Sequence, residues 1–246
     1  MPRRPRPLLA AAAAAVLGVA LLAGCATGGV GSSSAPTPSA EASTTAPPAD
    51  VDVSVGWLDG GAMIAVALRG SSTCVPYADS VTVSDGVLHV SLVEADQPCT
   101  RDSVLRAVAV PTPAGVAAAD DIAVEVTGEG YRGSAMLAGV AGLAPAGGVE
   151  TAQPSAGWLG PDAFALLTWG SSSCRPTVAD VAVQPSDEIA VTFATPPRDE
   201  ICTADMAPRV SVVSVAGAVA GTAYTAVVAQ EPASGDPLRV PIAGTP

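Results

Sequence analysis

Two short stretches of the sequence place small hydroxyl side chains between a glycine and a cysteine, and these residues are the best suited to chemistry. The stretches are Gly70-Ser71-Ser72-Thr73-Cys74 and Gly170-Ser171-Ser172-Ser173-Cys174. Glycine beside small hydroxyls lets backbone N–H groups converge, and such a turn can hold an anion or a sugar hydroxyl. The candidate binding residues are therefore Ser71, Ser72, Ser171 and Ser172. The alternative is a tight turn that leads into a disulfide, with the hydroxyls bonded to backbone groups.

Catalysis by these serines is not expected, because a serine nucleophile needs a base within hydrogen-bond reach. The single histidine, His89, falls on the polar face of an expected strand, and Ala190 occupies the matching place later in the chain. The G-x-S-x-G frame of a nucleophile elbow is also missing. We predict that the protein is not an enzyme. The enzymatic alternative is an envelope hydrolase with two carboxylates about 5–10 Å apart. No pair of acidic residues occurs at matching positions in both parts of the chain, however.

Each of the two stretches is followed later in the chain by another cysteine, and an arginine stands seven residues after that cysteine. Cys99-Thr100-x-Asp102 precedes Arg106, and Cys202-Thr203-x-Asp205 precedes Arg209. We expect each aspartate to form a charge-assisted hydrogen bond with the arginine four residues later, which would fix the loop. In the alternative, Arg106 and Arg209 bind the carboxylate or phosphate of a ligand.

The tryptophans fall into two classes. Trp57 and Trp158 each precede an alternating apolar run, so we expect both of them in a hydrophobic core. Trp169 aligns with Arg69 and flanks Gly170. This position makes Trp169 a candidate for stacking on a ligand.

No metal ion and no cofactor is predicted. The cysteines lack the C-x₂-C spacing of zinc sites. Asp120-Asp121 and Asp199-Glu200 are paired acids without EF-hand spacing, so we expect solvated loops there. The sequence contains no lysine, which excludes a phosphate-binding glycine loop that ends in lysine.

These motifs recur because the later sequence is a tandem repeat. Gly56-Trp57-Leu58 opens one unit and Gly157-Trp158-Leu159 opens the other, and the serine, cysteine and arginine positions follow in the same order. We predict two domains, residues 51–146 and residues 152–243. Since each unit should hold its own disulfide, we pair Cys74 with Cys99 and Cys174 with Cys202. Each disulfide is expected to stabilise the folded chain by about 3 kcal/mol. The repeat resembles the small secreted β modules of actinobacteria.

Apolar residues alternate with small or polar residues in short runs. Examples are Ile64, Val66 and Leu68 in the first unit and Ile189, Val191 and Phe193 in the second. Period-two alternation, broken about every 8–12 residues by Gly, Pro, Asp or Ser, is typical of short strands. We therefore predict an all-β fold of two β-sandwich-like domains, each with five to seven strands.

The first residues have the layout of a secretory signal. Three arginines precede an apolar run from Leu8 to Gly24, and the run ends in Leu22-Ala23-Gly24-Cys25. This tetrapeptide resembles the lipobox of bacterial lipoproteins. The resemblance implies that residues 1–24 are removed and that Cys25 carries a diacylglycerol, which would anchor the protein at the extracytoplasmic face of the cell membrane. The alternative is an uncleaved membrane helix.

Ser, Thr, Ala, Gly and Pro dominate the next segment, so we predict that residues 25–50 form a lipidated, disordered tether. Without the three signal arginines the net charge falls from −12 to −12 − 3 = −15, which disfavours nucleic acid as a partner. Four cysteines remain after Cys25, an even number that fits an exported protein with disulfides. We expect a non-enzymatic binding module for an envelope protein or a cell-wall glycan; a ligand-free spacer is the other alternative.

Overall fold

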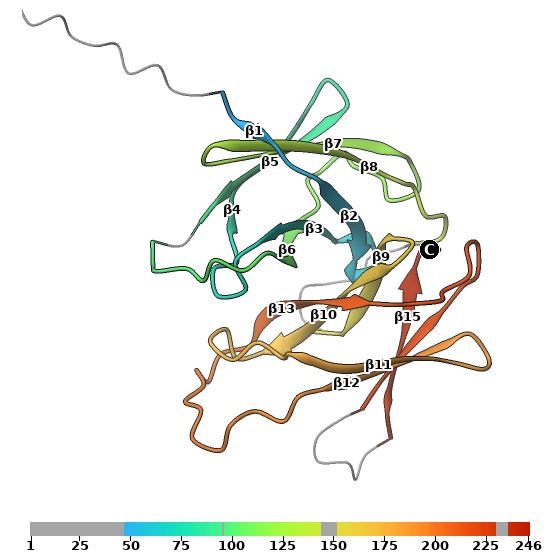
Figure 1. The fold of residues 1–246 in the computed structure, drawn as a ribbon. Helices are drawn as coiled ribbons and strands as arrows, with labels where there is room; N and C mark the ends of the chain where they lie inside the picture. The colour runs from blue at the N-terminus through green and yellow to red at the C-terminus, as the bar shows by residue number, and fades with distance from the viewer. Residues whose placement is uncertain (1–46, 95, 144–151, 230–235) are drawn as a thin grey trace, which may run out of the picture. The chain divides into compact units, whose positions relative to one another are not determined.

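Short strands form the regular structure of the chain, as the alternating apolar residues predict (Figure 1). The computed structural model describes residues 47–94, 96–143, 152–229 and 236–246. Within these ranges the structure has one 3₁₀ turn, Asp59–Gly61, and no α-helix, which confirms the all-β prediction. The predicted signal peptide, Cys25 and the predicted tether up to residue 46 lie outside the described residues.

The strands fall into two groups along the chain. We call residues 47–143 the first half and residues 152–246 the second half. The strands of the first half are β1 (Ala49–Asp50), β2 (Val53–Leu58), β3 (Met63–Gly70), β4 (Tyr77–Ser84), β5 (Val87–Val93), β6 (Val104–Pro111), β7 (Ile122–Gly128) and β8 (Tyr131–Leu137). Those of the second half are β9 (Ser155–Gly160), β10 (Ala163–Gly170), β11 (Val178–Gln184), β12 (Glu188–Phe193), β13 (Ala207–Ser214), β14 (Thr225–Val228) and β15 (Leu238–Ala243).

Two sheets enclose the core of the first half. One has the order β2-β3-β6, and the other has the order β1-β8-β7-β5-β4. Their facing apolar side chains form one buried cluster, which includes Trp57, Ile64, Leu88 and Val124. Trp57 is buried, as predicted, and its indole Nε1 donates a hydrogen bond to the Ala138 carbonyl oxygen over 2.8 Å.

A single sheet with the order β11-β12-β14-β15-β9-β10-β13 forms the second half. Its apolar side chains gather in a separate cluster. Trp158 is buried there, as predicted, and it packs edge-on against Phe164 and Tyr224, with ring centroids 5.5 and 5.9 Å apart. Each half therefore places its tryptophan in its own core.

Five strand pairings have the same order and direction in both halves, whereas β15–β9 and β1–β8 each occur in one half alone. In the first half β2–β3, β3–β6, β4–β5 and β7–β8 are antiparallel, whereas β5–β7 is parallel. In the second half β9–β10, β10–β13, β11–β12 and β14–β15 are antiparallel, whereas β12–β14 is parallel. A parallel pair needs a crossover connection, and β6 and β13 lie within these two crossovers.

The halves contact each other through β2 and β9 and through β6 and β13, and all described residues belong to one compact unit. A Cβ atom at Gly56 would meet the Trp158 carbonyl oxygen, and one at Gly157 would meet the Trp57 carbonyl oxygen. Leu58 of the first half and Leu159 of the second share one buried cluster with small and apolar residues of β3, β6 and β10. Both glycines are therefore needed for the close approach of the two strands.

The folded part begins two residues earlier than the sequence predicted. Ala49 and Asp50, which we assigned to the tether, form β1 and pair in parallel with β8. The Asp50 carboxylate also accepts a hydrogen bond from Arg132 Nε over 2.8 Å. No helix in the described ranges has the length and apolar character that crossing a membrane requires.

Candidate functional site

Both predicted disulfides are present. Cys74 is bonded to Cys99, and Cys174 is bonded to Cys202, with Cα atoms 5.5 Å apart in each pair. Each bond joins the loop that follows β3 or β10 to the segment that leads into β6 or β13. The disulfide pairing that the repeat predicted is confirmed.

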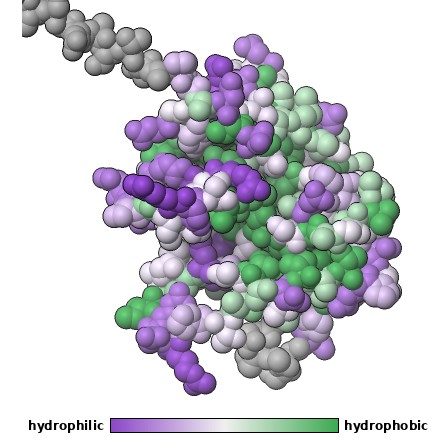
Figure 2. All heavy atoms as spheres, in the orientation of Figure 1, coloured by the Kyte–Doolittle hydropathy of each residue, from purple (hydrophilic) through white to green (hydrophobic). Residues whose placement is uncertain are grey.

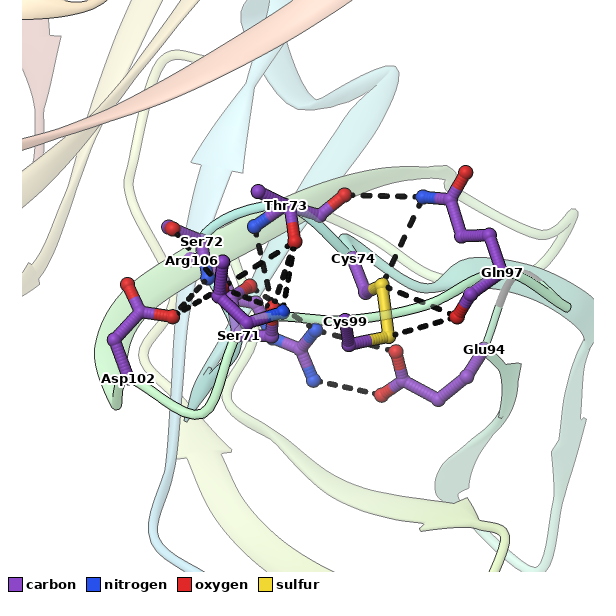
Figure 3. Close-up of a disulfide and its surroundings, with 10 residues drawn as sticks. Ser71, Ser72, Thr73, Cys74, Glu94, Gln97, Cys99, Asp102 and Arg106 are labelled. Carbon is purple, nitrogen blue, oxygen red and sulfur yellow. Dashed lines mark hydrogen bonds and ion pairs between the residues drawn. A yellow bond between two sulfur atoms is a disulfide. The ribbon is translucent and has the colours of Figure 1, made fainter.

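In the first half, the hydroxyls after Gly70 bond to partners within the chain (Figure 3). Ser71 Oγ lies 2.7 Å from Thr100 Oγ1, and the Ser72 backbone N–H donates to the Asp102 carboxylate over 3.1 Å. The Thr100 hydroxyl donates to the same carboxylate, and its backbone N–H donates to Thr73 Oγ1 over 3.0 Å. This is the arrangement of a turn that closes on itself beside a disulfide.

The second half repeats this network with equivalent residues. Ser171 Oγ lies 2.8 Å from Thr203 Oγ1, and the Ser172 backbone N–H donates to the Asp205 carboxylate over 3.0 Å. The Thr203 hydroxyl donates to that carboxylate, and its backbone N–H donates to Ser173 Oγ over 3.0 Å. Both sets of predicted binding serines are therefore engaged inside their own loops.

The two aspartates are the acceptors that close these loops. Hydrogen bonds from Thr100 and then Ser72 lower the pKa of Asp102 from 3.8 to about 2. Hydrogen bonds from Thr203 and then Ser172 lower the pKa of Asp205 from 3.8 to about 2. Both carboxylates are therefore ionised at neutral pH.

The predicted aspartate–arginine pairs are wrong. The Asp102 carboxylate accepts hydrogen bonds from its own loop, including one from the Ser72 backbone N–H. The Arg106 guanidinium instead pairs with Glu94, which follows β5 (Figure 3). The two bonds are bidentate, with Nη2–Oε1 at 2.6 Å and Nη1–Oε2 at 3.2 Å. Arg106 is only 9% exposed, so Glu94 compensates a buried charge.

The equivalent arginine of the second half has different partners. Arg209 donates from Nη1 to the Cys174 carbonyl oxygen over 2.9 Å and from Nη2 to the Trp169 carbonyl oxygen over 3.1 Å. Among the described residues, no carboxylate oxygen lies within the 4.0 Å ion-pair distance of Arg209. The Arg209 Nε is buried and has no hydrogen-bond partner among the described residues, and the same holds for the Arg106 Nε. Burial of the guanidinium lowers the pKa of Arg209 from its ordinary value.

Glycines allow both arginines to lie across the ends of their neighbouring strands. A Cβ atom at Gly170 would come within 2.7 Å of the guanidinium carbon of Arg209. A Cβ atom at Gly70 would meet the Arg106 guanidinium in the same way. The glycine of each Gly-Ser-Ser stretch is thus needed by the arginine as well as by the turn.

The register of the strands identifies what replaces Glu94 in the second half. Val90 pairs with Val81, and Val191 pairs with Val181, so Val90 and Val191 occupy equivalent positions. Four residues after Val90 stands Glu94, whereas four residues after Val191 stands Thr195. The second half therefore has a hydroxyl where the first half has a carboxylate.

A cavity of about 410 Å³, which we call the Arg209 cavity, opens at this place in the second half. Its walls come from the second disulfide, from the loops on either side of it and from the end of β12. The lining residues are Ser171, Cys174, Arg175, Pro176, Thr177, Thr192, Phe193, Ala194, Thr195, Pro196, Pro197, Glu200, Cys202, Arg209 and Ala229. Of the predicted binding residues, the structure brings Ser171 and Arg209 together here.

Other predicted residues lie away from this cavity or have other partners. Trp169 does not line the cavity, and its indole Nε1 donates to the Gln153 carbonyl oxygen over 3.1 Å. His89 lies on β5 with its Nδ1 3.3 Å from a Glu125 carboxylate oxygen. Glu200 lies near the sulfurs of the second disulfide, which are bonded to each other and are not available as metal-ligating thiolates.

Apolar side chains are exposed next to the cavity. Ile201 stands between the lining residues Glu200 and Cys202 and is 92% exposed, and Met206, four residues after Cys202, is exposed as well but does not line the cavity. The first half has Pro98 and Ser103 at the equivalent places relative to Cys99. On the face drawn in Figure 2, hydrophobic residues also reach the surface among hydrophilic ones.

Sequence reasoning missed Glu94 and Thr195. Neither residue belongs to a matched motif, because the two halves differ there. Counting forward from the matched valines Val90 and Val191 would have identified both positions. Comparison of the chain with protein-family models, with curated proteins and with solved structures finds no match.

Proposed function

We propose that the protein is a lipid-anchored, non-enzymatic binding module at the extracytoplasmic face of the cell membrane. Its partner in this proposal is an envelope protein or a cell-wall glycan. The anchor is Cys25 in Leu22-Ala23-Gly24-Cys25, and residues 26–48 form the tether. Two disulfides in the folded part favour an oxidising compartment.

We further propose that the two halves are copies of one β-sandwich-like domain. The matched motifs support this, and so do the five strand pairings that share their order and direction. Duplication followed by divergence also accounts for Glu94 and Thr195 at equivalent positions. In this proposal the first copy retains a sealed site, and the second copy carries the binding site.

The Arg209 cavity is the observation that carries the binding role. Its volume of about 410 Å³ lies within the range of small-molecule sites, roughly 300–1,000 Å³. Apolar residues line the cavity, and so does Arg209, which has no acidic partner among the described residues. A non-enzymatic role is supported by the serine loops, in which Ser71 and Ser171 share hydrogen bonds with Thr100 and Thr203 and no histidine takes part among the described residues.

Photo-crosslinking in cells tests the binding role. A crosslinking amino acid at Thr177, an exposed residue of the cavity wall, is expected to give a discrete protein or glycan adduct. The matched control is Tyr77, the equivalent exposed residue of the first half, which should give no such adduct. Absence of an adduct at Thr177, or equal adducts at both positions, would count against a binding site in the second half.

Fatty-acid labelling tests the anchor independently. The wild-type protein should incorporate a clickable fatty acid, and Cys25→Ala should abolish the label and release the protein from membranes. Cys174→Ala, which leaves Cys25 in place, serves as the control for loss of a cysteine. Labelling that persists in Cys25→Ala would disprove the lipid anchor.

A further inference from the structure

We propose that the Arg209 cavity binds an organic carboxylate whose neighbouring group is apolar. This inference rests on the binding role proposed above and names the ligand class of the same cavity. The first half provides the template, because its equivalent arginine is bound by a carboxylate of the chain itself. In the second half, the ligand would supply the group that Glu94 supplies to Arg106.

Arg209 has N–H donors that are not used by the protein and could bond to such a ligand. A guanidinium carries five N–H donors, and two of those of Arg209 bond to the carbonyl oxygens of Cys174 and Trp169. The remaining three have no partner among the described residues; the buried Nε is one of them, and the Nε of Arg106 is also buried without a partner, so the two arginines differ at Nη1 and Nη2. In Arg106, Nη1 and Nη2 bind the two oxygens of one carboxylate. The planar fork of arginine can bind either a carboxylate or a phosphate through two parallel bonds. The Arg106–Glu94 pair of the first half is therefore the reason to favour a carboxylate here.

The rest of the lining determines what should be attached to the carboxylate. Phe193, Pro176, Pro196 and Ala229 contribute apolar surface to the cavity, and exposed Ile201 flanks it. Burial of apolar ligand surface is favourable by about 25 cal/mol per Å². A carboxylate with a methyl or larger apolar substituent therefore fits the cavity better than formate or a polyanion.

The other charges at the cavity have opposite effects. Arg175 lines the wall where the first half has Val75, so it adds a second positive charge. Glu200 lines the wall where the first half has Gln97, and its carboxylate opposes an anionic ligand. Neither forms an ion pair within the described residues. Glu200→Gln should therefore bind the ligand about two- to fivefold more tightly.

The direct test follows the arginine side chains of the full-length protein in detergent by NMR. The sequence has eleven arginines and no lysine, so the ¹⁵Nε–Hε region is simple enough to resolve individual side chains. N-acetyl-L-alanine is titrated at constant ionic strength, and N-acetyl-L-alaninamide is the uncharged control. We expect a saturable shift of the Arg209 resonance with the acid alone. The Arg106 resonance is the internal control and should not move, because Glu94 already occupies its fork.

Three variants assign the effect to the cavity. Arg209→Lys keeps the charge but loses the fork, and it should weaken binding about tenfold or more. Thr195→Glu places a carboxylate of the chain at the position of Glu94, and it should abolish the response to the acid. Glu200→Gln should strengthen the response and remains informative even if the Arg209 variant does not fold.

Each outcome decides the proposal. A response to the amide, a response of Thr195→Glu equal to that of the wild type, or no saturable shift in both the wild type and Glu200→Gln would overturn it. Titration with N-acetyl-trialanine distinguishes the sources of the carboxylate: tighter binding than N-acetyl-L-alanine assigns a peptide C-terminus, and equal binding assigns a small free acid. A crosslinked adduct at Thr177 without any carboxylate response would preserve the binding role and disprove the ligand class.

Discussion

The two arginines that follow the disulfides occupy equivalent positions but differ in what neutralises them. Arg106 is bound by Glu94, whereas Arg209 bonds to backbone carbonyl oxygens. A charged group in a partly buried place is tolerated when its donors are paired, and the cost rises when a partner is removed. At the position of Glu94 the second half has Thr195, and there Arg209 lines a cavity and has no acidic partner among the described residues.

Replacing Glu94 should destabilise the first half. Glu94→Gln leaves the buried Arg106 without its counter-charge, and we expect a loss of about 2–3 kcal/mol in the free energy of unfolding. Urea unfolding followed by circular dichroism measures it. The matched control is Thr195→Val in the second half, which should change stability by less than about 0.5 kcal/mol. Equal effects of the two substitutions would contradict the role assigned to Glu94.

The pKa values of the loop aspartates predict how stability depends on acid. The pKa of Asp102 and that of Asp205 are both about 2 in the folded chain, below the ordinary value of 3.8. Their stabilising contribution is therefore present above about pH 4 and is lost as the pH falls towards 2. In Asp102→Asn and Asp205→Asn the free energy of unfolding should fall less steeply between pH 4 and pH 2. Urea titrations at several pH values measure this slope, and an unchanged slope in both variants would disprove the assignment.

At the scale of elements, each disulfide fastens two strands of one half through their loops. Cys174–Cys202 joins the end of β10 to the segment before β13, over a sequence separation of 28 residues. These two strands pair directly, and the same connection also shapes the wall of the Arg209 cavity. The loop is therefore held at both ends, by the disulfide and by the Asp205 network.

Removing the Cys174–Cys202 disulfide should lower the stability of the second half more than that of the first. For Cys174→Ser combined with Cys202→Ser we expect a loss of about 3–4 kcal/mol, since the unfolded chain regains the entropy of a loop of this length. Hydrogen exchange followed by mass spectrometry should locate increased exchange in β10 and β13. The equivalent double variant at Cys74 and Cys99 should move the effect to β3 and β6. Increased exchange that spreads evenly over both halves would contradict two separately stapled units.

At the scale of the whole molecule, both Gly-Trp-Leu motifs serve the contact between the halves. Each glycine lets β2 and β9 approach, each tryptophan fills the core of its own half, and each leucine enters the shared cluster. The three residues point in alternating directions, as a strand requires. One tripeptide can therefore contribute to two cores.

A larger residue at this contact should destabilise the chain. Gly157→Val would bring its side chain against the Trp57 carbonyl oxygen, and we expect a loss of about 1–3 kcal/mol from overpacking. Ala182→Val on β11 is the control, because it enlarges an exposed strand position. Guanidinium unfolding measures both variants. A Gly157→Val protein as stable as the control would show that the two strands do not need their close approach.

The all-β fold, the disulfide pairing and the burial of Trp57 and Trp158 could be predicted from the sequence, whereas β1 could not. These features depend on local alternation and on the repeat, and both can be read along the chain. The groups that the arginines meet depend on the packing of the chain, because Glu94 follows β5 of one sheet and Arg106 lies on β6 of the other. The Asp102–Arg106 prediction failed for that reason: nearness in sequence placed the two side chains together, whereas the turn held the aspartate and the strand carried the arginine elsewhere. The Arg209 cavity likewise depends on the packing of loops that no single motif contains.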